Sequence, residues 1–170
     1  MSVLKNKRGL SKLEFYHNAR KMRKEITKLV LRDFGIHSRG KRFKEETNSQ
    51  QPEGYYDELL EEFSRSVRQL LRNLMLNITA GNTIYPTSND ELMLRRRYQN
   101  GAIINCQQLH QEILYLEDVI PVKASMFIPY IELIQFEEKL LRGWRKSNNK
   151  LQEQITAKKQ EKKGRDDESE

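Results

Sequence analysis

Hydrophobic residues recur at steps of three and four along four stretches of the chain, at residues 11–34, 56–80, 89–119 and 124–150. This spacing places them on one side of an α-helix and leaves polar side chains on the other. Long amphipathic helices joined by turns pack side by side around one core. The pattern therefore predicts an all-α, antiparallel four-helix bundle.

Two of the four predicted helices carry the most regular apolar stripes. The second has the cleanest pattern, comprising Leu59, Leu60, Phe63, Val67, Leu70, Leu71, Leu74, Met75 and Ile78. The third is expected to face the core with Leu94, Tyr98, Ala102, Cys106, Leu109, Ile113, Leu116 and Ile120.

Short sequence signals indicate where these helices begin and end. Ser11 and Ser88 each precede a glutamate by three residues, which is the pattern of a capping box. Gly35 is expected to end the first helix as a C-cap, and Gly81 with the turn at residues 84–86 to end the second.

Composition predicts less order outside the bundle, which is expected to span residues 11–150. Residues 1–10 are interpreted as a flexible basic N-terminus and residues 36–54 as a long polar loop. Residues 151–170 lack the apolar pattern and form a charged stretch of low sequence complexity. This composition indicates a frayed helix end followed by a disordered tail.

The apolar band of the segment 124–150 is wider than one face of a bundle helix requires. Either this helix lies centrally in the bundle, or a second protomer covers part of it. On the second interpretation, the expected subunit contacts are Phe127, Tyr130, Ile131, Ile134 and Trp144.

The distribution of charge along the chain indicates that the bundle is a binding protein. The net charge is +7. Residues 1–51 carry a net +9 and residues 142–150 a net +4, whereas residues 52–141 carry −5. Basic surfaces attract phosphate backbones or acidic partners, although a charged helix face is often only solvated. Five cations share one face of the first predicted helix: Arg20, Lys21, Lys24, Lys28 and Arg32.

Three consecutive arginines, Arg95, Arg96 and Arg97, begin the second turn of the third predicted helix. The helix macrodipole disfavours cations there, so the triplet costs helix stability. Successive residues point about 100° apart, so the three side chains cannot serve one purpose. We expect one to pair inside the bundle with Glu61 or Glu62, and the others to reach solvent or a partner.

A second basic cluster, formed by Arg142, Arg145 and Lys146, flanks Trp144 near the end of the last predicted helix. Trp144 could stack on a nucleobase or a guanidinium, or it could close the end of the core. The three cations are candidate nucleic-acid or polymerase contacts, and they also suit the dipole at a helix C-terminus.

Few residues suggest catalysis. Cys106 is the single cysteine, so no intramolecular disulfide can form, and its place on an apolar stripe favours a buried, unreactive thiol. His17, His37 and His110 lack the spacing of metal ligands, so no metal and no cofactor are expected. No apolar run reaches the roughly 20 residues that a membrane span needs. A cytoplasmic protein without a membrane partner is expected.

One pattern leaves an enzymatic alternative open. Arg32 and His37 have the R-x4-H form that resembles the motif of HEPN-type ribonucleases, in which arginine and histidine act on the scissile phosphate. A bundle that only scaffolds other proteins is a further alternative.

Several motifs, in order, resemble the accessory variability determinant family of diversity-generating retroelements. They are Ser11–Phe15 at the first helix, Ala80–Thr87 between the second and third, Leu94–Arg96, and the Leu-x-Gly-Trp sequence at Leu141–Trp144 followed by Arg145. The resemblance covers about residues 10–150.

This resemblance implies a non-catalytic partner of a reverse transcriptase. Members of the family form barrel-shaped homopentamers with a basic surface. They bind the reverse transcriptase and the template RNA, possibly also the cDNA, and support mutagenic cDNA synthesis. The basic residues would then be contacts to the polymerase or its RNA.

Overall fold

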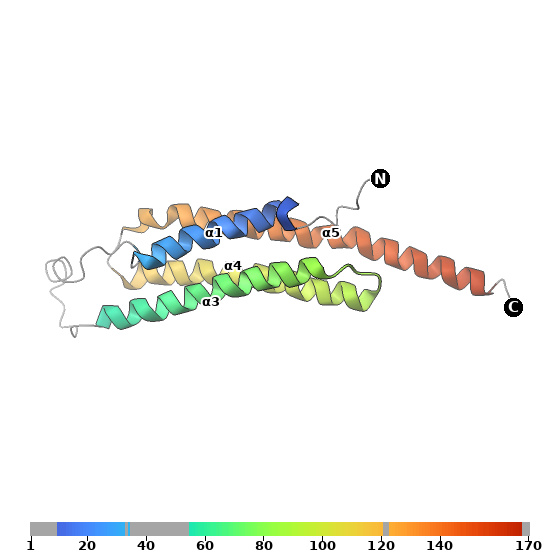
Figure 1. Ribbon diagram of the computed structural model, residues 1–170, viewed down its shortest axis with the longest axis horizontal. Helices are drawn as coiled ribbons and strands as arrows, with labels where there is room; N and C mark the ends of the chain where they lie inside the picture. The colour runs from blue at the N-terminus through green and yellow to red at the C-terminus, as the bar shows by residue number, and fades with distance from the viewer. Residues whose placement is uncertain (1–9, 33, 35–54, 121–122, 168–170) are drawn as a thin grey trace.

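The computed structural model describes residues 10–32, 34, 55–120 and 123–167 (Figure 1). The expected basic N-terminus as far as residue 9, Gly35, His37 and the loop 36–54 lie outside these residues. The helices are η2 (Leu10–Lys12), α1 (Glu14–Leu31), α3 (Tyr55–Thr83), α4 (Asn89–Val119), η4 (Ala124–Met126) and α5 (Ile128–Asp167), η marking a 3-10 helix.

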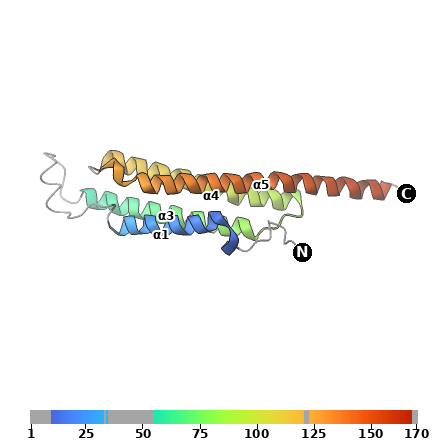
Figure 2. The same cartoon turned by 90° about the horizontal axis from the view of Figure 1, so that it is seen from above.

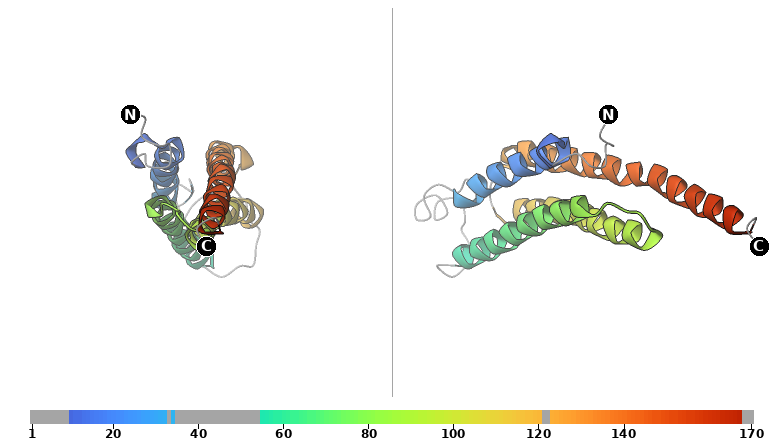
Figure 3. Two further views of the ribbon diagram at one scale, coloured as in Figure 1. Left: turned by 90° about the vertical axis from the view of Figure 1, so that its right-hand side faces the viewer. Right: turned by 45° about the vertical axis from the view of Figure 1, so that its right-hand side comes forward.

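The four long helices form an antiparallel bundle, as the hydrophobic pattern predicted. Successive helices run in opposite directions (Figure 1). α3 and α4 pack over the greatest length, followed by α4 and α5, and α1 packs on α3 and α5. Viewed along the bundle, α1 therefore lies diagonally across from α4 (Figure 3). Among the described residues the structure contains helices and no strand.

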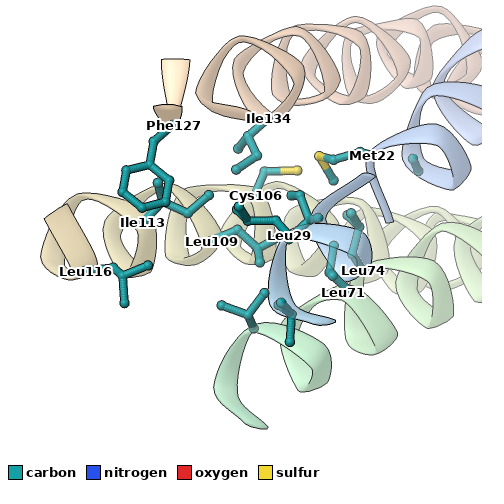
Figure 4. Packing of buried hydrophobic residues seen from close by; sticks show 14 of the residues in the cluster. Met22, Leu29, Leu71, Leu74, Cys106, Leu109, Ile113, Leu116, Phe127 and Ile134 are labelled. Carbon is teal, nitrogen blue, oxygen red and sulfur yellow. The ribbon is translucent and has the colours of Figure 1, made fainter. Parts of the chain in front are cut away.

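The core lies on the bundle axis and receives side chains from all four helices (Figure 4). Aliphatic residues interdigitate along most of its length, and burying them is the main favourable term in folding. Its labelled members in Figure 4 are Met22, Leu29, Leu71, Leu74, Cys106, Leu109, Ile113, Leu116, Phe127 and Ile134.

The predicted helix boundaries agree well for α4, whose bounds are those expected, and less well for α1. Ser88 caps α4, because its Oγ accepts a hydrogen bond from the backbone N–H of Glu91 at 3.3 Å. The Glu91 carboxylate accepts in turn from the backbone N–H of Thr87, and these hydrogen bonds lower the pKa of Glu91. α1 instead begins at Glu14 with Leu13 as its N-cap, so the predicted capping box does not form there.

α5 is longer than predicted and projects past the start of α4 (Figure 2). The expected frayed end near residue 150 is wrong, because the helix continues to Asp167. Gln, Glu, Lys and Ala dominate this stretch, and these residues lose little rotamer freedom in a helix. Ile155 is only 8% exposed, which shows that packing supports α5 for at least one further turn.

Polar residues occupy the inner stripe of α4 at its N-terminal end. Counting back from Leu116 in steps of three and four leads to Gln99, Arg95 and Leu92, and all three are buried. Leu94, which we expected on this stripe, is 44% exposed. The helical register, and not the apolar character of individual residues, decides which side chains point inward.

Two buried amides form one polar layer between α4 and α5. Asn148 Nδ2 donates to Gln99 Oε1 at 2.6 Å, and both residues are 0% exposed. Gln99 Nε2 and Asn148 Oδ1 lack a partner within the described part of the chain. Buried polar atoms in one layer favour a single register between two helices, because a shift would leave more of them unpaired.

A glutamate lies in the core between α5 and α1. Glu137 is 0% exposed, and its Oε2 accepts a hydrogen bond from Asn18 Nδ2 at 2.9 Å. Its Oε1 has no partner among the described residues. Burial raises the pKa of Glu137 to about 8, and the hydrogen bond from Asn18 opposes this shift. Glu137 is therefore mostly protonated at neutral pH, because a neutral carboxyl costs much less to bury than a carboxylate.

Two glycines within helices have opposite surroundings. A Cβ atom on Gly81 would lie 2.9 Å from Cη2 of Trp144 and 3.2 Å from Cβ of Tyr98, whereas one on Gly143 would meet nothing within 4 Å. Gly81 does not end α3, which continues to Thr83. It is instead the position where the α3 backbone approaches the indole ring.

The first prediction concerns the pH dependence of stability. The folded-state pKa of Glu137, about 8, lies above the unfolded-state value of about 4.3. The contribution of Glu137 to the free energy of unfolding is therefore complete when the pH is below its pKa in the unfolded state. It is lost as the pH rises towards its pKa in the folded state. Glu137→Gln keeps an acceptor for Asn18 without titrating, so this decline should be absent from the variant. Urea unfolding across this pH range measures it, with Glu132→Gln as the exposed control. An equal decline in parent and Glu137→Gln would contradict the assignment.

The second prediction compares the two glycines. Gly143→Ala should stabilise the protein by about 0.5–1 kcal/mol, because alanine restricts the unfolded chain and meets no obstacle in the helix. Gly81→Ala offers the same gain in helix propensity but forces the Trp144 ring to move, so it should destabilise. Urea denaturation of both variants checks this, and equal stabilisation by both would show that Trp144 does not pack against α3.

Candidate nucleic-acid interface

The cationic face expected on α1 is present on the surface. All five predicted residues, Arg20, Lys21, Lys24, Lys28 and Arg32, are exposed. Lys28 pairs with Glu25 at 2.9 Å, and this hydrogen bond is the main cause of a lowered pKa at Glu25.

The other cations of α1 keep most of their charge uncompensated. The guanidinium of Arg20 lies 5.9 Å from the ring centroid of Tyr16. Arg23, which sequence reasoning did not include, is also exposed. Arg23 lies outside the regular i, i+4 series of cations, so the spacing did not indicate it. Its charge alone could have placed it among the predicted cations of α1. α1 is thus a basic surface on which Lys28 pairs with Glu25.

The three consecutive arginines of α4 point in three directions, as the helical geometry predicted. Arg95 is buried at 2% exposure, Arg96 is half-buried against α5, and Arg97 is exposed. The expected internal pairing with Glu61 or Glu62 is wrong. Glu61 instead binds Arg65 on its own helix at 2.9 Å.

Arg95 stabilises the end of a neighbouring helix and is not available to a partner. Its Nη1 donates to the carbonyl oxygen of Ile84 at 3.2 Å, directly after α3 ends at Thr83. Its guanidinium also lies 5.7 Å from the Trp144 ring centroid. The carboxyl end of α3 carries partial negative charge and no basic residue in its last turn, so Arg95 supplies the missing cation. Burial lowers the pKa of Arg95, but an arginine stays charged at neutral pH.

Arg96 of α4 is held against α5 by two neutral side chains. Its Nη2 donates to Asn149 Oδ1 at 2.9 Å and to Gln152 Oε1 at 3.0 Å. Both acceptors are amides, which fix the direction of the guanidinium without neutralising its charge. The sequence did not single out these amides, because only the antiparallel pairing of α4 with α5 brings them beside Arg96.

Arg145 and Arg142 continue this arrangement along α5. Arg145 Nη1 donates to Asn100 Oδ1 at 2.9 Å, again a neutral amide. Arg142 pairs with Glu138, which also accepts from Gln107 of α4 at 3.0 Å. We call Arg96, Arg145 and Arg142 the arginine row. Two of its three guanidiniums are oriented but not neutralised by described side chains. Lys146 and Arg97 are exposed and belong to the same two helices.

Trp144 closes the end of the core, so it is not available to stack on a nucleobase. It is 9% exposed, and its ring stacks on Phe15 at 4.5 Å between centroids with planes 21° apart. The structure therefore confirms core packing for Trp144, and the guanidinium of Arg95 over its ring also confirms the expected guanidinium contact.

The five expected subunit contacts are used within the chain's own bundle. Phe127 and Ile134 are 0% exposed, and Tyr130 and Ile131 are partly buried against the core. Trp144 is also buried, so the chain's own helices cover three of these five side chains, and Tyr130 and Ile131 keep part of their surface accessible. α1 and α4 pack on α5 and cover most of its apolar band, whereas Phe136 of α5 remains 44% exposed. Of the two interpretations of that band, the structure supports burial inside the bundle.

A different set of apolar residues faces solvent on α4. Met93, Ile104 and Tyr115 are 58%, 50% and 55% exposed. They follow one another eleven residues apart, which is close to three helical turns and aligns them on one side of α4. The sequence between Arg97 and Glu112 contains no acidic or basic residue apart from His110. This outer line is the most apolar exposed part of α4.

The third prediction tests the structural role of Arg95. Arg95→Met should lower the free energy of unfolding by about 1–3 kcal/mol, because methionine cannot bind the Ile84 carbonyl or offset the end of α3. Arg97→Met removes the same charge from an exposed position and should change stability by less than about 0.5 kcal/mol. Urea unfolding at one pH measures both. Unchanged or increased stability in Arg95→Met would show that the cost of burying the guanidinium exceeds what its contacts contribute.

Other chemistry has little support in the structure. Cys106 is 0% exposed, and burial raises the pKa of its thiol, as expected of an unreactive core residue. Within the described ranges, no three His, Cys, Asp or Glu side chains are grouped so that they could hold a metal ion. None of the described helices is long and apolar enough to span a bilayer. Comparisons with protein-family models, with curated proteins and with solved structures gave no match to this chain.

Proposed function

We propose that the chain is a non-catalytic accessory protein of a diversity-generating retroelement. It binds the reverse transcriptase and the template RNA through basic surfaces, acts in the cytoplasm and supports mutagenic cDNA synthesis. The support comes from the ordered motifs between about residues 10 and 150 and from the placement of the basic side chains on the bundle.

The orientation of the arginine row is the observation that carries the proposal. Arg96 and Arg145 are fixed by amide oxygens at 2.9–3.0 Å, so they lose little further freedom when a ligand binds. An amide leaves the positive charge in place, whereas a carboxylate would cancel it. Guanidinium groups bind phosphate through paired hydrogen bonds, which makes a polynucleotide backbone the natural counterion.

The two basic surfaces contribute in different ways. The cations of α1 are exposed and largely unpaired, so they attract a polyanion over distance and increase its rate of encounter. The arginine row makes the directed contacts once the strand arrives. The affinity for RNA then depends on both basic surfaces, whereas the orientation of the bound strand depends on α4 and α5.

Contacts with the polymerase and between copies of the chain need a separate surface. Met93, Ile104 and Tyr115 are each at least half exposed, although the Tyr115 ring also contacts Phe63 of α3 at 5.4 Å between centroids. This exposed line suits such a purpose. A homopentamer, as the family resemblance implies, would be built on such exposed residues and not on Phe127 or Ile134.

The fourth prediction concerns RNA binding. The parent should bind single-stranded RNA with an affinity that falls steeply between about 50 and 500 mM salt, because binding phosphates releases counterions. Replacing Arg96 and Arg145 together by methionine should weaken binding and reduce the slope of log K against log salt by about 1.4, at roughly 0.7 per phosphate contact. Fluorescence anisotropy of a labelled RNA measures both quantities.

The matched control replaces Arg65 and Arg68 of α3 by methionine. Arg65 pairs with Glu61, and Arg68 donates to the Ser64 carbonyl, so neither belongs to the α4–α5 surface. Its salt slope should equal that of the parent. Equal affinity of the parent at both salt concentrations, or an unchanged slope in the Arg96 and Arg145 variant, would overturn the proposed interface. Cleavage of the RNA would instead favour the ribonuclease alternative with Arg32 and His37.

A further inference from the structure

The arginine row ends at a shallow notch on α5. This notch is open to solvent and is lined by one face of the helix, near the part that projects past α4 (Figure 2). Its lining residues are Asn149, Gln152, Glu153, Thr156, Ala157 and Gln160. Two of them, Asn149 and Gln152, are the residues that hold Arg96, so the guanidinium lies at the edge of the notch.

Arg96 determines which way the two amides face. A guanidinium can only donate hydrogen bonds, so the oxygens of Asn149 and Gln152 must point towards it. The NH2 groups of both amides are then left to donate to a ligand. With the remaining N–H groups of Arg96, this side of the notch offers donors and no amide acceptor.

Next to these donors the notch offers a carboxylate. Glu153 is exposed and contributes two acceptor oxygens. The small residues Thr156 and Ala157 follow one helical turn later. The hydroxyl of Thr156 donates to the Gln152 carbonyl at 2.9 Å, so its proton is not available to a ligand. The notch thus places hydrogen-bond donors beside a carboxylate, with small residues one turn further along α5.

We propose that this notch binds an unstacked guanine base of single-stranded RNA, an inference that rests on the proposed function. Guanine presents two adjacent acceptors, O6 and N7, which suit the donors of Arg96 and the amides. It also presents N1–H and the N2 amino group, which suit the two oxygens of one carboxylate. Bases in single-stranded RNA are commonly recognised on these edges.

The same groups disfavour other ligands. A phosphate would approach the negative charge of Glu153. Adenine places an amino group beside N7, where the nearest groups are the N–H donors of Arg96 and of the two amides. Uracil has one N–H for the carboxylate where guanine has two donor groups. A strand with phosphates along Arg142 and Arg145 would reach the notch at Arg96.

Binding of three matched RNAs tests the proposal. Each is about 12 nucleotides long and repeats UUG, UUA or UU-inosine, since inosine lacks only the N2 amino group of guanine. The parent should bind the guanine RNA about tenfold more tightly than the adenine RNA, with inosine between them. Anisotropy at one fixed salt concentration gives the three affinities.

Variants of the notch separate base recognition from charge. Glu153→Gln replaces one acceptor oxygen by a donor, so the guanine and adenine RNAs should bind this variant with nearly equal affinity. The adenine RNA should bind it as tightly as it binds the parent, or more tightly. Gln152→Ala should also reduce the preference. Gln154→Ala removes an exposed amide that does not line the notch and should leave the preference unchanged.

The possible failures are distinguishable. If the parent binds all three RNAs equally but retains its salt dependence, the notch does not read guanine and the proposed function stands. In a further outcome, the parent binds all three RNAs equally while Glu153→Gln binds each of them more tightly by the same factor. The notch then holds phosphate, and this result also overturns the inference. If no RNA binds at low salt, the proposed function itself fails.

Discussion

Trp144 joins all four helices at one end of the bundle, and the rest of the structure depends on this contact. Its ring stacks on Phe15 of α1, touches the backbone of α3 at Gly81 and lies beneath the guanidinium of Arg95 from α4. A large ring in such a place contributes both buried area and a defined geometry. Because α5 carries Trp144, the same contact sets the register that brings Arg145 beside Asn100 and Arg96 beside Asn149.

The fold could be predicted from the sequence because local and long-range signals agree. The apolar spacing of α4 and its Ser88 cap gave the observed bounds, and the stripe of α3 lies in the core or packs against it as expected. The polar members of the inner stripes were missed. Arg95 and Gln99 fit the three-and-four spacing as well as any leucine, but apolar character was given more weight than register. Counting back from Leu116 would have identified them.

The candidate site could be predicted only in part, for a different reason. Charge and exposure on α1 follow from one helix, and those predictions agree with the structure. The environment of Arg96 depends on which residues of α5 lie opposite, and this depends on the alignment of two helices distant in sequence. The same holds for Phe127 and Ile134, whose burial depends on how completely α1 and α4 cover α5. Pairwise packing of this kind is not encoded in a short motif.

The neutral carboxyl of Glu137 has a consequence for the electrostatic field around the molecule. Counting residues gives +7, but that sum assigns Glu137 a negative charge, and its protonation near pH 7 brings the total to about +8. One of these charges belongs to Arg95 and is shielded from bulk water by the bundle. The exterior therefore carries about +7, the same as the formal value, because an uncharged acid and a hidden base cancel in the count. An acidic group that ionised in the core would weaken the potential felt by an approaching polyanion without altering a single surface residue.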